Sequence, residues 1–245
     1  MRLVPADLAD ADDLASLIRA AETFAPDLLV NDAGLGTYGL FLETPAERHD
    51  ATVLVNVAAP VALARALLPG MIERASAANG RCALLNVAST LAFIPVPYGA
   101  IYGASKAFVL SFTEALAAEL ARQPIDVLAI CPGPVRTRFF DRAGAPQGAP
   151  PGSSDPEQVA RRALADLGRL NVTFSDIPSA LALRPIADMR VGLGRTLALG
   201  IGAWQSFRGR PRPPEPEPPF EPEPPAASPP PTRPRRGPKP AGSPS

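Results

Sequence analysis

The sequence predicts an α/β protein built on a doubly wound parallel sheet, and three observations support this prediction. Short apolar runs alternate with longer amphipathic segments, the pattern of parallel strands joined by covering helices. The segment Leu28–Asn31 is short and fully apolar up to its last residue, as a buried strand is. With 245 residues, the chain is long enough for one good-sized α/β domain or two small ones.

The first part of the chain predicts two strands and two helices. Arg2–Pro5 reads as a strand, and Asp10–Phe24 follows as a helix with apolar residues on one face. Leu28–Asn31 is the next strand. A helix then starts near Thr44, which can cap it, and Pro45 suits its first turn. That helix continues through Leu54–Leu68, with Pro60 as the expected position of a kink.

The second part continues the alternation. Its expected elements are the strand Cys82–Val87, a helix over about Gly99–Arg122, the strand Ile125–Cys131, a helix from a cap at Asp155 to about Leu170, and a last strand Val172–Phe174. Beyond it, Ser179–Trp204 predicts one or two loosely packed helices. The expected organisation is an α/β domain (1–175), a weakly defined helical segment (176–208) and a tail (209–245).

The tail differs sharply in composition from the rest. Sixteen of the 32 prolines lie after Gly209, and Phe220 is the one aromatic residue there. Such a segment buries too little apolar surface to offset its ordering entropy, so we expect disorder. A polyproline II ligand for an aromatic groove is the alternative.

Composition excludes several classes of function. The 24 basic and 24 acidic residues balance, so no net field favours nucleic acid. Cys82 and Cys131 lie in apolar runs and are expected to be buried, reduced thiols. No signal sequence is expected, and the best candidate for a membrane span, Ser179–Trp204, is interrupted by charges. A cytoplasmic, soluble protein is the simplest account. His49, the one histidine, is expected at the surface, and no metal site is expected.

A glycine pattern after Leu28–Asn31 invites a dinucleotide-binding interpretation. Gly34-Leu35-Gly36-Thr37-Tyr38-Gly39 matches G-x-G-x-x-G. The pattern holds a pyrophosphate only where it opens directly into a helix. Here the next helix signal comes at Thr44-Pro45, so we reject the match.

Ser89, Tyr102 and Lys106 form a stronger set. Tyr102 and Lys106 stand four residues apart on one predicted helix and share a face. Ser89 follows a strand, and sites in open α/β sheets lie at the carboxyl ends of strands. A neighbouring ammonium should lower the pKa of the tyrosine from its usual value of about 10, which suits it to proton transfer. Alone, Y-x-x-x-K is a weak signal, because this spacing is common by chance.

The surroundings of this set resemble the short-chain dehydrogenases/reductases. Asn31-Asp32-Ala33-Gly34 is similar to their N-N-A-G turn, and Asn56 falls where they keep a helix asparagine. Asn86-Val87-Ala88-Ser89 and Tyr102-Gly103-Ala104-Ser105-Lys106 resemble their catalytic serine and Y-x-x-x-K. Cys131–Thr137 resembles their P-G-x-v-x-T segment. The resemblance covers about residues 1–170 and implies a Rossmann-like fold.

The resemblance also implies roles. Tyr102 would be the general acid or base, Lys106 would tune it and bind the nicotinamide ribose, Ser89 would orient the substrate oxygen, and Asn56 would hold a relay water. A structural asparagine is the alternative for Asn56. The implied cofactor is NADP, or else NAD, and its contacts would be Asp7, Asn31, Ala33, Gly34, Tyr102, Lys106, Pro132, Gly133 and Thr137. The implied substrate is a small carbonyl compound or alcohol; homo-oligomerisation stays open.

Two departures from the family pattern stand out. Asp32 replaces the second asparagine of the turn, which puts an acid near the cofactor and weakens the expected bonding at the centre of the sheet. The family's T-G-x-x-x-G-x-G loop, with its flanking βα unit, is missing before Arg2, so the sheet should expose apolar edges.

Three alternatives therefore remain. The chain is a reductase whose natural start lies upstream, a truncated product that binds cofactor poorly, or a non-catalytic interaction protein.

Overall fold

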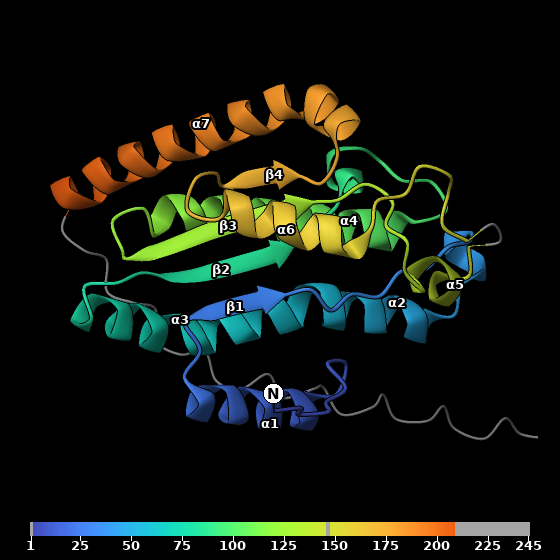
Figure 1. The fold of residues 1–245 in the computed structure, drawn as a ribbon, viewed down its shortest axis with the longest axis horizontal. Helices are drawn as coiled ribbons and strands as arrows, with labels where there is room; N and C mark the ends of the chain where they lie inside the picture. Colours follow the sequence, from blue (N-terminus) through green and yellow to red (C-terminus); the bar gives the residue numbers. More distant parts are fainter. Residues whose placement is uncertain (1, 146–147, 209–245) are drawn as a thin grey trace, which may run out of the picture. The chain divides into compact units, whose positions relative to one another are not determined.

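The computed structural model describes residues 2–145 and 148–208, and its centre is a four-stranded parallel sheet (Figure 1). The strands are β1 (Leu28–Asn31), β2 (Cys82–Val87), β3 (Ile125–Cys131) and β4 (Val172–Phe174), in the order β1-β2-β3-β4. All four have the bounds that the sequence predicts. The predicted tail, 209–245, lies outside the described residues.

Helices cover both faces of the sheet, which makes it doubly wound as predicted. Alternate residues of β3 point to opposite faces, because side chains alternate along a strand. Val127 packs with α3 (Ala59–Ala77), and Ala129 packs with α4 (Ala100–Glu119). Leu128 and Ile130 pack on the other face, where α6 (Pro156–Asp166) contributes buried Ala163.

The predicted helix from Thr44 to Leu68 is one continuous run of three pieces. These are α2 (Ala46–Val53), a π-helical turn (Leu54–Ala58) and α3. The departure from α-helical geometry is therefore the π-helical turn, which comes before Pro60. Pro60 itself lies in the first turn of α3, where the missing N–H of a proline costs least because it has no partner in the helix. Thr44 is not the cap: its hydroxyl donates to the Leu40 carbonyl, and Pro45 occupies the N-cap position.

The prediction of a strand at Arg2–Pro5 is wrong. These residues are exposed and belong to no sheet; the side of β1 that does not pair with β2 is left unpaired in the described residues. The chain first becomes regular at α1 (Ala11–Phe24), where the Asp10 carboxylate accepts from the N–H groups of Asp12 and Asp13. Such capping satisfies donors that the helix itself leaves free.

β1 is an edge of the described sheet, as the sequence predicts. Leu28 and Val30 are 38% and 45% exposed, respectively, although they are aliphatic strand residues. A cavity of about 340 Å³ lies beside this strand, between α1 and α3. An unpaired, apolar strand edge of this kind normally needs covering.

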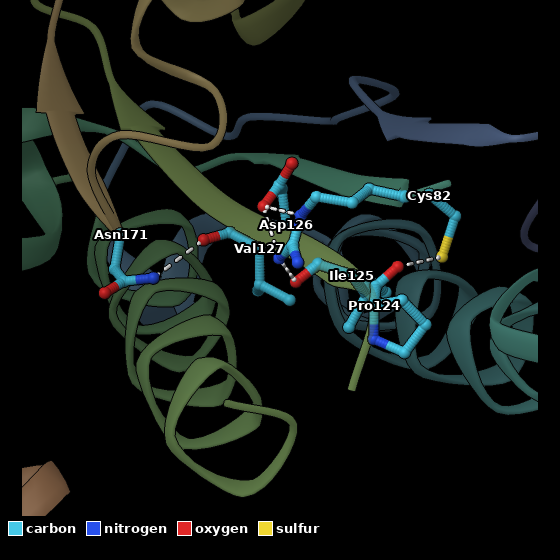
Figure 2. Close-up of polar contacts among 7 residues, drawn as sticks. Cys82, Pro124, Ile125, Asp126, Val127 and Asn171 are labelled. Atoms are coloured by element: carbon cyan, nitrogen blue, oxygen red, sulfur yellow. Dashed lines mark hydrogen bonds and ion pairs between the residues drawn. The ribbon is translucent and has the colours of Figure 1, made fainter. Parts of the chain in front are cut away.

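The start of β3 is held by polar contacts to both of its neighbours (Figure 2). The Arg81 guanidinium, next to β2, donates to the Asp126 carboxylate at 2.9 Å and to the Ile125 carbonyl. Asn171 donates to the Val127 carbonyl at 3.1 Å from the β4 side. The Cys82 thiol faces the Pro124 carbonyl, and burial raises the pKa of that thiol.

The segment after β4 is more regular than the sequence suggests. One helix, α7 (Ile177–Arg208), covers the stretch Ser179–Trp204, for which the sequence predicts one or two helices. Up to Trp204 it belongs to the same compact unit as the sheet. Ala187 is fully buried in the core beside α4 and β4.

Among the described residues, the helix long and apolar enough to cross a membrane is the continuous run Ala46–Ala77, and not Ser179–Trp204. By length and composition alone it could cross a membrane, although half of its most apolar window is buried inside the protein. Leu63, Leu67 and Met71 from this run lie in the core against the sheet. This burial is what a core helix of an α/β domain shows.

Candidate active site

The three residues of the predicted proton-transfer set come together at the carboxyl end of β2. Ser89 follows this strand and is buried, and its hydroxyl accepts from the Leu91 N–H at 3.1 Å. Tyr102 and Lys106 share one face of α4. The Ser89 side chain lies near enough to the Tyr102 hydroxyl to lower the pKa of that tyrosine. The Lys106 ammonium lies 5.9 Å from the centre of the Tyr102 ring.

Lys106 is a buried cation, with 5% of its surface exposed. Its Nζ donates to the Val87 carbonyl at 2.7 Å. Burial lowers the pKa of Lys106 to about 8, and the charge of Asp32 acts in the opposite direction. The amine has three donors, so it retains capacity for further acceptors.

The sequence predicts that the Lys106 ammonium lowers the pKa of Tyr102, but in the structure this pKa is raised. Burial raises the pKa of Tyr102, because removal from water penalises the phenolate. The Ser89 side chain offsets part of that increase. The ring also packs against Phe139, with the ring centres 5.2 Å apart, and this contact contributes to the burial.

Asn56 lies in the π-helical turn and is 1% exposed. Its Oδ1 accepts from the Leu35 N–H, and its Nδ2 donates to the Leu35 carbonyl, each at 2.8 Å. Nδ2 also donates to Ser105 Oγ at 2.9 Å, and this hydroxyl in turn donates to the Tyr102 carbonyl. These bonds connect the loop after β1 with the catalytic helix. They give the side chain a structural role, and its part in a proton relay stays a prediction.

The expected cofactor residues after β1 lie near this set. A Cβ added at Gly34 would stand 3.4 Å from Lys106 Nζ and 3.5 Å from Asn56 Oδ1, so the Gly34 backbone lies against both side chains. Ala33 is exposed. Asn31 is half-buried, and its Nδ2 donates to Asn86 Oδ1 at 2.8 Å, so bonding between the central strands is present beside Asp32.

The remaining expected cofactor contacts are more scattered. Pro132 and Gly133 follow β3, and the Pro132 carbonyl accepts from the Thr90 N–H just beyond Ser89. Thr137 is exposed, and its hydroxyl accepts from the Phe139 N–H. Asp7 is also exposed and accepts from the Ala9 N–H ahead of α1. No contact in the structure joins Asp7 to the other expected residues within the described part of the chain.

Sequence reasoning did not single out Asn86 and Thr113 as members of the site's framework. Both are fully buried. Asn86 Nδ2 donates to Thr113 Oγ1 at 2.8 Å, which extends the bond from Asn31 across β2 to α4. The available signal was a polar residue inside the apolar strand Cys82–Val87, because a buried amide requires partners.

The glycine pattern at Gly34–Gly39 does not open into a helix, as predicted. It leads to a short 3₁₀ turn, Phe41–Glu43, and α2 begins at Ala46. Gly36 has a different function: a Cβ there would stand 2.5 Å from the Phe139 ring. The glycine therefore allows α5 (Phe139–Ala143) to pack over the loop.

The predictions for the cysteines and for His49 have different outcomes. Cys82 and Cys131 are both buried free thiols, as predicted. His49 is half-buried rather than fully solvated: it stacks on Phe41 with ring centres 4.7 Å apart, and its Nε2 faces the Phe41 carbonyl. Within the described residues, no cluster of His, Cys, Asp or Glu could hold a metal ion.

Comparison with known proteins points to one family. The family model of the short chain dehydrogenases matches residues 1–148. The inactive 2-(S)-hydroxypropyl-CoM dehydrogenase 2 of Xanthobacter autotrophicus is 35% identical over 180 residues, which cover 72% of this chain and 74% of that protein. The probable oxidoreductase EphD of Mycobacterium tuberculosis is 34% identical over 140 residues. This chain spans about a quarter of its length, 23%.

A solved structure shows the same similarity in three dimensions. The short-chain dehydrogenase from Sphingobium yanoikuyae, in complex with NADPH, is 31% identical to this chain and superposes with a TM-score of 0.68. The match covers 78% of this chain and 73% of that one. The family model matches more than half of the chain, the sequence relatives and the solved structure agree with it, and the chain therefore belongs to the short-chain dehydrogenase family.

Proposed function

We propose that this protein is an NAD(P)-dependent oxidoreductase that interconverts a carbonyl and an alcohol by hydride transfer. The observation that carries the proposal is the position of Ser89, Tyr102 and Lys106 together at the carboxyl end of β2, with the Lys106 ammonium 5.9 Å from the centre of the Tyr102 ring. Ligand sites in open α/β sheets lie at this end of the strands.

The residues fit the nicotinamide end of such a cofactor. The buried Lys106 amine donates to one carbonyl and has donors left for ribose hydroxyls, and the Gly34 backbone lies directly against it. When bound, the cofactor supplies or accepts the hydride at the carbon of the substrate. NADP is our choice between the two nicotinamide cofactors, on the similarity to the NADPH complex.

The protein's own residues donate and accept the proton of the substrate hydroxyl group. In the reducing direction the Tyr102 hydroxyl donates its proton to the substrate oxygen as hydride reaches the carbon, which yields the alcohol. Lys106 stabilises the phenolate that remains, and the Ser89 hydroxyl holds the substrate oxygen beside Tyr102. A raised tyrosine pKa favours the protonated form, which is the form that reduction requires.

A second candidate function is a domain that keeps the proton-transfer residues but binds the cofactor weakly. One observation favours it: no glycine-rich turn in the described part of the chain runs from a strand directly into a helix, the arrangement that holds a pyrophosphate. The similarity to a Xanthobacter dehydrogenase named as inactive supports this candidate as well.

The experiment that separates the two is cofactor binding with turnover of a test ketone. NADPH and NADH are titrated into the purified chain and followed by nucleotide fluorescence. Binding in the micromolar range with turnover supports the oxidoreductase, and absence of binding supports the weak-binding domain.

Tyr102→Phe is the decisive variant. We expect a loss in kcat of about 10²–10⁴-fold, the usual contribution of a positioned acid or base, with the Kd for NADPH unchanged. Tyr98→Phe is the matched control, because Tyr98 stacks on Tyr38 rather than on the catalytic helix. Full turnover by Tyr102→Phe contradicts the assignment.

A further inference from the structure

The Phe139 ring contacts two separate parts of the candidate active site. Its centre lies 5.2 Å from the centre of the Tyr102 ring, and the two rings are tilted by 48°. A Cβ added at Gly36 would stand 2.5 Å from Phe139 Cζ and 3.1 Å from its Cε2, so the Gly36 backbone also lies directly against this ring. One aromatic side chain of α5 therefore connects the tyrosine on α4 with the loop after β1.

The helix that carries Phe139 is held in place from outside. α5 has five residues, too few for its own hydrogen bonds to keep it folded. The Ala143 carbonyl accepts from the Tyr38 N–H at 2.9 Å, and the Arg142 carbonyl accepts from Arg48 Nη2 at 3.1 Å. The loop after β1 and α2 thus both bind the end of α5, and these bonds fix the position from which the Phe139 side chain extends.

Position 36 is occupied by glycine because of this packing. Its φ lies outside the left-handed region that favours glycine, so the backbone conformation does not require one. Space does, because carbon atoms in contact normally stand about 3.5–4.0 Å apart. A Cβ at Gly36 would be far closer to Phe139, and it would also stand 3.3 Å from the Ala143 Cβ. Any side chain there would push the Phe139 ring away from its present place against Tyr102.

The contact with Phe139 accompanies a difference in exposure among the tyrosines. Tyr102 is half-buried, whereas Tyr38 and Tyr98 are 51% and 53% exposed, respectively. Burial raises the pKa of Tyr102, which is the effect that cover by an apolar ring produces. Water beside a proton donor competes with the substrate for its proton, and exclusion of water prevents this side reaction.

We propose that Phe139 is a positioning residue for Tyr102: its ring covers the tyrosine ring and keeps water from it, and Gly36 leaves the space that the Phe139 ring needs. Phe139 acts through Tyr102 and transfers no proton itself. Its consequence for turnover rests on the proposed oxidoreductase function. The cover of Tyr102 does not.

Solvent access to Tyr102 can be measured directly. The chain contains three tyrosines, and with ¹³C-labelled tyrosine rings their signals are assigned by single substitutions to phenylalanine. A soluble gadolinium chelate speeds the relaxation of each signal according to its exposure. In the wild type we expect the weakest effect at Tyr102. In Phe139→Ala and in Gly36→Ala the effect at Tyr102 should rise toward that at Tyr98, which should itself stay unchanged.

Three further variants make the result specific. Gly80→Ala adds the same Cβ at a glycine with open space around it, and Phe108→Ala removes a ring from α4 that is 40% exposed. Neither should change the effect at Tyr102. Phe139→Met retains an apolar side chain and should stay close to the wild type. An unchanged effect at Tyr102 in Phe139→Ala, or an equal rise in Phe108→Ala, overturns the proposal.

A kinetic arm extends the test to function. Where the chain turns over a ketone, Phe139→Ala should lower kcat by up to about 10²-fold with the KM for NADPH unchanged, and Phe139→Met should recover most of the loss. Unchanged kcat beside an exposed Tyr102 overturns the positioning role. Absence of turnover in every protein, the wild type included, counts against the proposed function, while the relaxation measurement still decides whether Phe139 covers Tyr102.

Discussion

At the scale of single residues, burial and charge compete most directly at Lys106. Burial favours the neutral amine and lowers its pKa to about 8, well below the usual value of 10.5. The folded protein therefore releases the lysine proton at lower pH than the unfolded chain does. Between about pH 8 and 10.5 the unfolded state binds more protons, so this group makes the folded state more stable as pH rises.

Lys106→Met should remove this contribution. From pH 8 to 9.5, the free energy of unfolding of the wild type should rise relative to that of the variant by about 1.5 kcal/mol. Urea unfolding at several pH values measures the difference. Because the cysteines titrate in the same range in both proteins, only the difference is informative. A constant difference over this range would show that the amine is not buried in solution.

For Asn56, the sequence predicts that the side chain is buried and hydrogen-bonded but not which residues it bonds. A polar residue among apolar helix residues predicts a buried amide with partners, and the structure supplies them from Leu35 and Ser105. The partner on the loop comes from 21 residues away. No local pattern identifies that partner, because only the packing of the π-helical turn Leu54–Ala58 against the loop after β1 brings the two residues together.

At the scale of elements, a buried hydrogen-bond chain fixes β1 and β2 to the catalytic helix. It runs from Asn31 through Asn86 to Thr113, whose hydroxyl also donates to the Val109 carbonyl one turn earlier. A buried donor left without its acceptor costs about 1–3 kcal/mol. The chain therefore holds α4, and Tyr102 and Lys106 with it, at a set position over the sheet.

Thr113→Val should destabilise the protein by about 1–3 kcal/mol, because the Asn86 amide loses its acceptor while side-chain volume is kept. Thr23→Val is the matched control. Thr23 also donates to the carbonyl four residues before it, but it is exposed and accepts from no buried amide. Chemical denaturation of both variants measures the difference. Equal losses would mean that the Asn86–Thr113 bond contributes nothing of its own.

At the scale of the whole molecule, a partly buried ion pair attaches α7 to α4. The Arg190 guanidinium binds Glu114 with Nε and Nη2, at distances down to 2.7 Å; the Glu114 side chain is 9% exposed and that of Arg190 37%. Breaking this pair leaves the nearly buried Glu114 carboxylate unpaired, which costs more than losing a surface pair. The late helix is thus fixed to α4 by more than apolar packing.

Arg190→Met should lower the free energy of unfolding by about 1–3 kcal/mol, since it leaves the Glu114 carboxylate, the more buried partner, without its donors. Arg161→Met, which removes an exposed partner of Glu157, should change it by less than about 1 kcal/mol. Thermal unfolding compares the two variants, and limited proteolysis reports whether α7 has detached. Similar Tm values for both variants would contradict a stabilising role of the Arg190–Glu114 pair.

The sequence by itself determined the fold class, all four strands, the place of Ser89, Tyr102 and Lys106 and the exposed edge at β1. These features follow from local patterns, because apolar runs, helical spacing and family motifs each involve residues that are close together in the sequence. Tertiary structure alone decided that Arg2–Pro5 forms no strand, that Ser179–Trp204 is part of one helix, and that burial raises rather than lowers the pKa of Tyr102. Each of these depends on which distant groups become neighbours: a strand requires a pairing partner, a helix face requires a surface to cover, and a pKa depends on how much water remains.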